Sequence, residues 1–419
     1  MSQTGPHVAI IGAGIVGVST AIWALRDGFS VTLIDRADPG EGTSFGNAGL
    51  LASSAIVPVT VPGLLAKAPR MALHPGTPLF LNWSYLPRLA PWLWRYLKHA
   101  NARDATARAQ AILPLIGDSL ADHQALAEGT GAEDWIVPCD YLAGYSSRAA
   151  YEADGFAWDL RRELGFDVKL LEADAIKDYD PALGPAIGCV ACLDGHGRIV
   201  DPGQYVKDLA QHTQKQGAGF VKAEVEAVLS EKSHVRGLRA GGEVLDCDKV
   251  VITAGVWSRT LAKELGLTVP LAPESGFHLE LLEPSVTPRA PMMVADGKFV
   301  ITPMQGRLRL AGMVGYLGLR AEAPKAPYQL MERHVRQVLP GLTWNDTRRW
   351  IGHRPAITDS CPLIGEIPGL RSAFVGFGHD HVGLTAGPRT GQILAQLMAG
   401  RRPNIDLTPF APDRFENAS

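Results

Sequence analysis

The sequence of 419 residues lacks the features of secreted, disulfide-stabilised or nucleic-acid-binding proteins. Its five cysteines are scattered and odd in number, which argues against a disulfide framework. Lysine and arginine total 40 residues against 43 aspartates and glutamates, so no overall positive field attracts nucleic acid. The first residues lead into an apolar segment without a charged leader, so we expect no signal peptide and predict a cytoplasmic protein.

Long uninterrupted apolar helices are also missing. Residues 43–66 carry no charge over a span long enough to cross a bilayer. Pro58 and Pro62, together with Ser53 and Ser54, make this span a poor helix. The sequence therefore predicts no membrane-spanning segment.

Metal-binding patterns are sparse. Cys189 and Cys192, followed by His196, have the spacing of a metal or redox pair, but only one such pair occurs and it lies in an apolar run. We interpret these cysteines as buried thiols. His379 and His381 have no evident third partner, so we predict no metal site.

The first 35 residues contain a pattern of strand, glycine turn, helix and strand. An apolar run at 8–11 leads into the glycine-rich stretch 12–17, and a second apolar run at 31–34 ends at Asp35. An apolar fraction of 46% and a charged fraction of 20% are typical of a globular protein. A chain of this length is too long for one compact core, so we expect two domains.

The three glycines have separate roles in a dinucleotide-binding turn. Gly12 permits the sharp turn, Gly14 lets backbone N–H groups approach a pyrophosphate, and Gly17 lets the helix pack closely on the sheet. The pyrophosphate then lies at a helix N-terminus, where unpaired N–H donors converge. Asp35 is placed to bind a ribose with a free 2′-hydroxyl, which indicates FAD or NAD rather than NADP.

Later segments predict two kinds of sheet. Strand-like runs at 219–221, 225 and 249–252 extend the opening sheet, and a hairpin is expected around 241–242. Residues 276–315 alternate apolar and polar side chains, which is typical of antiparallel strands in a second sheet. The predicted fold class is therefore α/β, with a Rossmann-like nucleotide-binding domain and a discontinuous second α+β domain built on an antiparallel sheet.

Several connecting segments complete this prediction. We expect a turn at 194–202, a helix at 204–216, and a closing strand and helix at 373–378 and 388–398. Residues 79–97 gather aromatic side chains interleaved with Arg88, Arg95 and Lys98, and a helical pattern follows at 102–126. An aromatic segment of this kind either packs on its own domain or lies on a membrane surface.

Taken in order, the motifs resemble the FAD-dependent D-amino-acid oxidase superfamily. The similarity rests on residues 12–17, Asp35, 43–49, 254–255, 352–355 and 378–385. Residues 43–49 and the aromatic insertion are most similar to bacterial D-amino-acid dehydrogenases and D-hydroxyproline dehydrogenases. The resemblance implies noncovalent FAD, because Cys361 is displaced from the place where sarcosine-oxidase-like relatives attach flavin. It also implies an FAD-binding domain of residues 1–55, 195–270 and 345–419 and a substrate domain of residues 56–194 and 271–344.

The resemblance carries over a set of cofactor contacts. Backbone of residues 12–17 should line the pyrophosphate, residues 44–49 should border the isoalloxazine, and residues 378–385 should follow the flavin O2 side. A helix N-terminus at that edge would stabilise the anionic reduced ring. The expected cofactor-binding residues are Gly12, Ala13, Gly14, Ile15, Val16, Gly17, Asp35, Arg36, Ser44, Asn47, Ala48, Gly49, Val225, Ala254, Gly255, Gly378, His379, Gly383, Leu384 and Thr385.

Three residues are candidates for contact with a substrate. Arg354 matches the arginine that pairs with the substrate carboxylate in this superfamily, and a guanidinium fork can hold a carboxylate bidentately. The alternative is a structural arginine paired with an acid such as Asp359. His278 and His381 are expected to tune amine protonation or bind a substrate side chain, with a structural role as the alternative for His278.

The implied reaction is dehydrogenation of the amine-bearing carbon of an amino acid, such as a D-amino acid or a D-hydroxyproline-type substrate, by hydride transfer to flavin N5. The imine then hydrolyses to a 2-oxo acid and ammonia. A quinone, a partner protein or oxygen takes the electrons, and the aromatic segment suggests peripheral contact with the inner membrane. Two alternatives stay open, which are a secondary-amine oxidase that produces hydrogen peroxide and a flavoprotein subunit of a hetero-oligomeric dehydrogenase.

Overall fold

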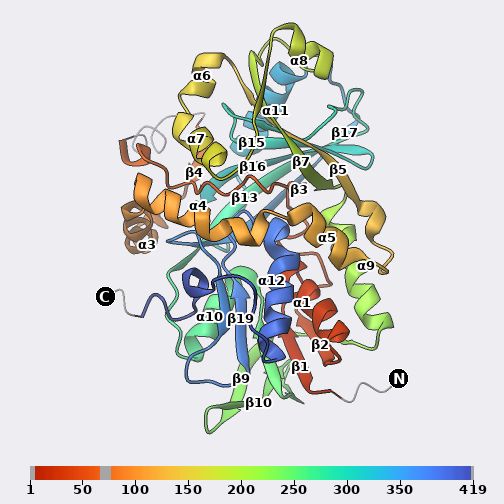
Figure 1. Cartoon of the computed structure of the whole chain (residues 1–419), viewed down its shortest axis with the longest axis vertical. Coiled ribbons are helices and arrows are strands. Elements are labelled where there is room, and N and C mark those ends of the chain that lie inside the picture. The colour runs from red at the N-terminus through yellow and green to blue at the C-terminus, as the bar shows by residue number, and fades with distance from the viewer. Residues whose placement is uncertain (1–4, 67–76, 417–419) are drawn as a thin grey trace.

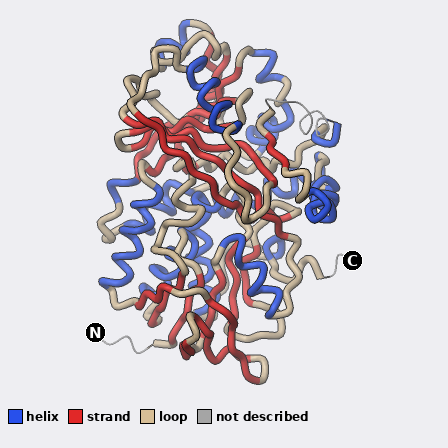
Figure 2. Tube along the Cα trace, turned by 180° about the vertical axis from the view of Figure 1, so that it is seen from behind, coloured by secondary structure: helices blue, strands red, loops and turns tan. Residues whose placement is uncertain are grey.

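The computed structural model describes residues 5–66 and 77–416, which form two stacked units. Figure 1 shows a six-stranded sheet in the lower half of the molecule and a ten-stranded sheet in the upper half. Helices α4 (Ala102–Ile116) and α5 (Ser119–Ala127) cross between the halves in this view. From behind, Figure 2 shows the larger sheet as one continuous twisted layer.

The six-stranded sheet contains the pattern predicted at the start of the chain. Its order is β18-β19-β12-β1-β2-β8, and all strands run parallel except the edge strand β18. The strands are β18 (Leu363–Glu366), β19 (Ala373–Phe377), β12 (Lys249–Ile252), β1 (His7–Ile11), β2 (Ser30–Asp35) and β8 (Gly219–Lys222). Short apolar runs form these strands because helices cover both faces of a parallel sheet. The strand, glycine turn, helix and strand prediction is confirmed, with α1 at Ile15–Arg26.

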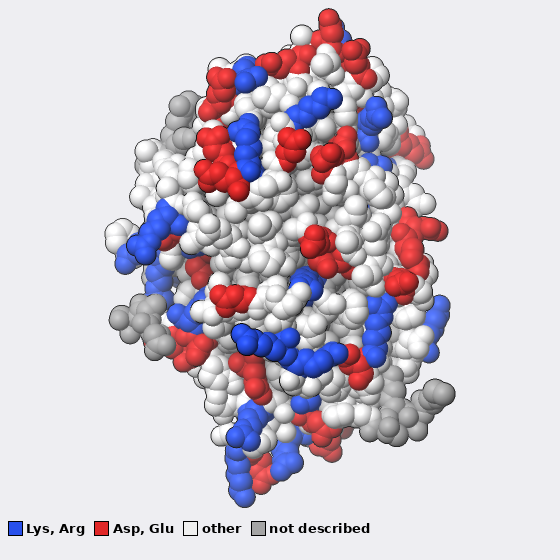
Figure 3. Space-filling view, in the orientation of Figure 1, with Lys and Arg blue, Asp and Glu red and all other residues white. Residues whose placement is uncertain are grey.

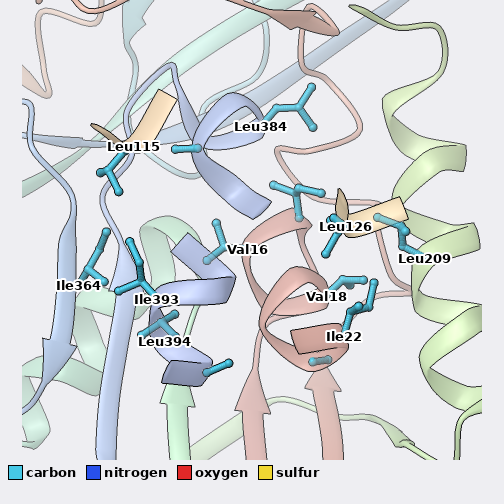
Figure 4. Close-up of a cluster of buried hydrophobic side chains, with 14 of the residues drawn as sticks. Val16, Val18, Ile22, Leu115, Leu126, Leu209, Ile364, Leu384, Ile393 and Leu394 are labelled. Carbon is cyan, nitrogen blue, oxygen red and sulfur yellow. The ribbon is translucent and has the colours of Figure 1, made fainter. Parts of the chain in front are cut away.

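Helix α12 (Gly383–Met398) packs directly on α1. Figure 4 shows Val16, Val18 and Ile22 of α1 in the same apolar cluster as Ile393 and Leu394 of α12. A Cβ atom added to Gly387 would lie 2.7 Å from the Ile15 side chain, so the glycines of α12 allow a close approach. As a result, the N-terminal halves of the two helices adjoin.

The ten-stranded sheet follows the order β17-β13-β16-β15-β14-β5-β7-β3, with β4 attached to β16 and β6 attached to β7. Its pairings are antiparallel except for β14 with β5 and β16 with β4. The strands are β17 (Asp346–Ile357), β13 (Leu271–Leu282), β16 (Arg307–Tyr316), β15 (Phe299–Met304), β14 (Met292–Val294), β5 (Ile136–Tyr145), β7 (Cys189–Ile199), β3 (Leu50–Leu51), β4 (Leu79–Leu81) and β6 (Lys169–Glu172). The antiparallel strands predicted over 276–315 are confirmed.

The remaining elements lie around these sheets. A small sheet contains β9 (Val225–Glu231), β10 (His234–Ala240) and β11 (Glu243–Asp246). The helices are α3 (Leu86–Lys98), α6 (Arg148–Glu152), α7 (Gly155–Glu163), α8 (Asp174–Tyr179), α9 (Pro202–Lys215), α10 (Ser258–Glu264) and α11 (Ala326–Val338). The hairpin predicted around 241–242 is confirmed as β10 and β11. The strand at 225 does not extend the opening sheet as predicted, because β9 pairs with β10 instead.

Two further predictions differ from the structure. The turn expected at 194–202 is wrong, because β7 continues to Ile199. Gly195 has φ +69, and the pairing register shifts opposite it between Cys139 and Tyr141, so the glycine produces a bulge instead of a turn. Residues 346–357, which we assigned to the FAD-binding domain, form β17 and pair with β13 in the ten-stranded sheet.

The aromatic segment at 79–97 has two faces. Trp92 and Tyr96 of α3 are buried and stacked with 4.7 Å between ring centroids, so this face packs on its own domain. Trp83 and Trp94 point outward and are 57% and 65% exposed. No helix in the described part of the chain is long and apolar enough to cross a membrane. Figure 3 shows acidic and basic side chains interspersed over the face of the molecule in view.

Candidate active site

A cavity of about 1330 Å³ is lined by residues of both units. It extends from the glycine turn after β1 to the wall formed by β13, β16 and β17. The predicted site residues that line it are Gly12, Gly14, Ile15, Val16, Asp35, Arg36, Ser44, Asn47, Ala48, Val225, Ala254, Gly255, Arg354, Gly378, His379, His381, Gly383, Leu384 and Thr385. Ala13, Gly17, Gly49 and His278 do not line it.

The glycine turn is tight on one side and open on the other. Gly12 has φ +106, and a Cβ atom there would lie 2.7 Å from the Thr253 carbonyl oxygen. At Gly17 a Cβ atom would lie 1.9 Å from the Gly12 carbonyl oxygen. A Cβ atom at Gly14 would meet only the Ser44 hydroxyl, at 3.3 Å. The turn therefore packs against β12 while its backbone stays accessible from the cavity.

Backbone N–H groups at two helix N-termini face this cavity. Neither Gly14, the N-cap of α1, nor Val382, the N-cap of α12, provides a side-chain cap. Ile15 N–H donates to Ser44 Oγ at 3.0 Å, whereas the N–H groups of the next two residues of α1 have no partner among the described residues. Such groups attract anions, so a pyrophosphate fits at α1 and an electron-rich ring edge fits at α12.

The end of β2 provides polar and planar groups for the nucleoside part of a ligand. Asp35 accepts hydrogen bonds from the N–H groups of Ala13 at 2.8 Å and Ala37 at 3.0 Å, which fixes its carboxylate beside the glycine turn. Arg36 lies over the Trp257 ring with 3.8 Å to the ring centroid. Both residues line the cavity, as expected for the adenosine end of a dinucleotide site.

A buried ion-pair network holds the loop at 44–49. Arg309 is fully buried, and its Nη1 donates to the carbonyl oxygens of Phe45 and Asn47, each at 2.7 Å. Glu280 accepts from Arg309 Nη2 at 2.7 Å and from Arg307 Nε at 2.7 Å. The loop backbone is thus fixed from behind by a guanidinium on the ten-stranded sheet. We did not predict Arg309, although a charged residue inside an apolar strand was a usable signal.

His278 lies behind the cavity wall. Its ring stacks on Trp350 with 5.0 Å between centroids, and its Nδ1 is 3.3 Å from the Gly46 carbonyl oxygen. Burial, with the nearby Arg309 cation, lowers the pKa of His278 to about 3. The imidazole is therefore neutral and supports the 44–49 loop, and it does not line the cavity.

Arg354 lines the cavity and has an internal counterion. Its Nη1 donates to Glu274 Oε1 at 2.7 Å and to the Met313 carbonyl oxygen at 3.2 Å. Glu274 and Arg354 are directly opposite each other on β13 and β17. Asp359, the acid considered from the sequence, pairs with Arg414 instead at 2.8 Å. In the described part of the chain, Arg354 Nε and Nη2 have no protein partner, so one edge of the guanidinium remains available.

A second ion pair lies in the loop before α12. Asp380 is buried in a left-handed conformation with φ +50, and its carboxylate lies 3.7 Å from His381 Nδ1. Burial opposes the charge on His381, but contact with Asp380 outweighs it and raises the pKa of His381. The His379 ring instead bonds Thr390 Oγ1 at 2.9 Å, and burial lowers its pKa to about 4. Two carboxylates, Glu274 and Asp380, were missed from the sequence.

The family model for FAD dependent oxidoreductases named DAO matches residues 7–397. The chain is also 37% identical over 419 residues to a D-amino-acid oxidase of Bradyrhizobium diazoefficiens, covering 98% of this chain and 99% of the relative. This chain belongs to the DAO family of FAD-dependent oxidoreductases. The family assignment confirms the resemblance inferred from the motifs, and it confirms the predicted cofactor.

Solved structures agree with this fold. Glycine oxidase from Geobacillus kaustophilus superposes with a TM-score of 0.77 at 21% identity, covering 98% of this chain and 99% of that chain. L-proline dehydrogenase from P. horikoshii superposes with a TM-score of 0.75 at 16% identity, covering 99% of both chains. In this DAO-family protein the glycine turn and the two uncapped helix N-termini fit FAD, whose pyrophosphate and ring edge need such donors.

Proposed function

We propose that this protein oxidises the amine-bearing carbon of a D-amino acid. The observation that carries the proposal is a continuous cavity that joins the dinucleotide turn to the free edge of Arg354. The 37% identical relative is a D-amino-acid oxidase, which supports both the D-configuration and oxygen as the electron acceptor. FAD, when bound, supplies the hydride acceptor.

Arg354 anchors the substrate carboxylate in this proposal. Because Nη1 is committed to Glu274 and Met313, the carboxylate binds the Nε and Nη2 edge, where two parallel N–H donors match its two oxygens. Gly276 leaves room for the guanidinium at this edge, since a Cβ atom there would lie 2.8 Å from Arg354 Nη2. A fixed carboxylate sets the position of the adjoining carbon, and positioning alone lowers such barriers by about 7–11 kcal/mol.

Glu274 also accepts the proton that the substrate ammonium must lose. The amine lone pair is needed to stabilise the developing iminium, so the reacting amine is unprotonated. Burial and the neighbouring Asp380 raise the pKa of Glu274, while the Arg354 contact opposes the rise. A carboxylate with a raised pKa takes up a proton more readily than an exposed one. The imine leaves and hydrolyses to a 2-oxo acid and ammonia.

Anaerobic bleaching of the bound flavin tests the proposal. The purified holoenzyme is mixed with D-, L- and N-alkyl amino acids, and air is admitted after reduction. We expect rapid bleaching by D-amino acids and fast recolouring in air. Slow recolouring would indicate that a compound other than oxygen accepts the electrons. Bleaching by N-alkyl substrates alone would identify a secondary-amine oxidase. Failure of every amine to bleach the flavin would contradict the proposed function.

A further inference from the structure

A second arginine lines the cavity on a different wall from Arg354. Arg161 belongs to α7, and its Nε donates to the Ser54 carbonyl oxygen at 3.0 Å while Nη1 donates to the Ala157 carbonyl oxygen at 3.1 Å. The guanidinium lies over the Trp158 ring with 4.7 Å to the centroid. Two backbone carbonyls and an aromatic face therefore fix the orientation of this cation.

Like Arg36 and Lys298, which also line the cavity, Arg161 has no ion-pair partner within 4 Å among residues 5–66 and 77–416, whereas Arg354 has one. Arg354 pairs with Glu274, and Arg309 pairs with Glu280. Asp154, a carboxylate that also lines the cavity, accepts a hydrogen bond from Tyr145 at 3.1 Å. Burial lowers the pKa of Arg161, whereas neighbouring groups that include Asp154 act in the opposite direction. A buried cation that faces a cavity without a direct ion-pair partner favours an anionic ligand there.

Tyr141 supplies a second donor beside Arg161. Its side chain lines the cavity, and its hydroxyl has no hydrogen-bond partner among the described residues. Burial raises the pKa of Tyr141 and outweighs the Arg161 charge, which lowers it, so the phenol stays protonated. Tyr141 belongs to the same apolar cluster as Trp158, the ring on which the Arg161 guanidinium lies. The neighbouring Tyr145 is already committed, since its hydroxyl bonds both Asp154 and Trp158. Arg161 Nη2 and the Tyr141 hydroxyl are thus two unused donors on one wall.

We propose that Arg161 and Tyr141 form a second anion subsite, which binds an acidic side-chain group of the substrate while Arg354 binds the α-carboxylate. This inference rests on the proposed function and identifies amino acids with two carboxylates as its preferred substrates, ahead of neutral amino acids. A carboxylate in the subsite receives one N–H and one O–H hydrogen bond and neutralises the Arg161 charge. Neutral amino acids fit the same cavity and leave that charge without a partner.

Selectivity between acidic and neutral substrates provides the first test. For D-glutamate and D-norvaline, the ratio of kcat/KM values is measured in the wild type and in Arg161→Met, which keeps an apolar stem but removes the charge. We expect the ratio to fall by about tenfold or more in Arg161→Met, because a hydrogen bond to a charged group is lost. Arg162→Met is the matched control, since Arg162 is the next residue of α7, is exposed and does not line the cavity. An unchanged ratio in Arg161→Met would overturn the proposal.

A binding measurement that needs no turnover separates this inference from the proposed function. Glutarate and butyrate are titrated into the oxidised holoenzyme, and the perturbation of flavin absorbance gives their Kd values. We expect tighter binding of glutarate in the wild type, with that preference lost in Arg161→Met and reduced about threefold or more in Tyr141→Phe. Equal affinities for the two probes in the wild type would overturn the subsite even if D-amino acids reduce the flavin. A reduced flavin content in Tyr141→Phe and Arg161→Lys would also overturn the proposed subsite, because it would show that these two residues bind FAD and not the substrate.

Discussion

Backbone N–H groups mark the phosphate-binding end of the cavity, whereas a side-chain ion pair of Glu274 and Arg354 marks the end at β13, β16 and β17. At the first end, Gly12 and Gly17 allow the turn to close on β12, and uncapped N–H groups face the ligand. At the other end, Glu274 neutralises Arg354 across two strands. The first end presents donors that any dinucleotide phosphate can use. We therefore expect discrimination between substrates to depend on the walls beyond the nucleotide end.

The largest expected effect follows from a substitution within the glycine turn at the nucleotide end. In Gly17→Ala, the new Cβ atom would meet the Gly12 carbonyl oxygen at 1.9 Å, so the turn and α1 must separate. We expect almost complete loss of FAD and a destabilisation of about 3 kcal/mol or more. The flavin-to-protein ratio and the Tm measure both effects. Gly341→Ala is the control, because no atom lies within 4 Å of its added Cβ; FAD retention in Gly17→Ala would refute the role of the tight turn.

Removing the guanidinium at the opposite end should separate substrate binding from cofactor binding. Arg354→Met loses the bidentate contact with the carboxylate, so we expect kcat/KM to fall by about 100-fold or more while the flavin content stays unchanged. The variant also leaves Glu274 buried without its cation, which lowers stability. Adding Glu274→Gln should restore the Tm but not the activity. Restoration of both would mean that Arg354 has only a structural role.

Arg309 connects the two ends, because it reaches from the ten-stranded sheet to the loop that borders the expected flavin position. Arg309→Met removes two hydrogen bonds from the carbonyl oxygens of Phe45 and Asn47. We expect FAD affinity to fall by about 10-fold to 100-fold, since hydrogen bonds to charged groups contribute about 1.5–3 kcal/mol. Equilibrium dialysis of FAD measures the change. Arg336→Met, which removes an exposed ion pair with Glu332, is the control.

A more gradual effect concerns acid pH. Burial lowers the pKa of His379 near the cavity and of His123 in the core to about 4 each, below the ordinary value of 6.5. Between pH 4 and 6.5 these two histidines bind protons in the unfolded chain but not in the folded chain. The free energy of unfolding therefore falls as the pH drops from 6.5 toward 4. Each such histidine contributes a slope of about 1.4 kcal/mol per pH unit within this window. The pH dependence of Tm should flatten in His379→Asn, and an unchanged slope would contradict this assignment.

The two ends of the cavity also differ in how well the sequence predicts them. The nucleotide end is contiguous, and its strand, glycine turn, helix and strand were predicted within the first 35 residues. Arg354 was recognised from its motif, but Glu274 lies 80 residues away and meets it only through the register of β13 and β17. Arg161 and Arg162 are adjacent in sequence, and only the packing of α7 decides which one reaches the cavity. Periodicity alone cannot provide such pairings.

The most direct test of whether this protein oxidises D-amino acids is an anaerobic stopped-flow experiment. It measures the rate at which D-alanine and L-alanine reduce the flavin of the oxidised holoenzyme. The wild type should be reduced by D-alanine and not by L-alanine, and Arg354→Met should need a much higher D-alanine concentration to reach the same rate. Reduction by L-alanine at an equal rate, or identical concentration dependence in Arg354→Met, would contradict the proposed orientation of the substrate.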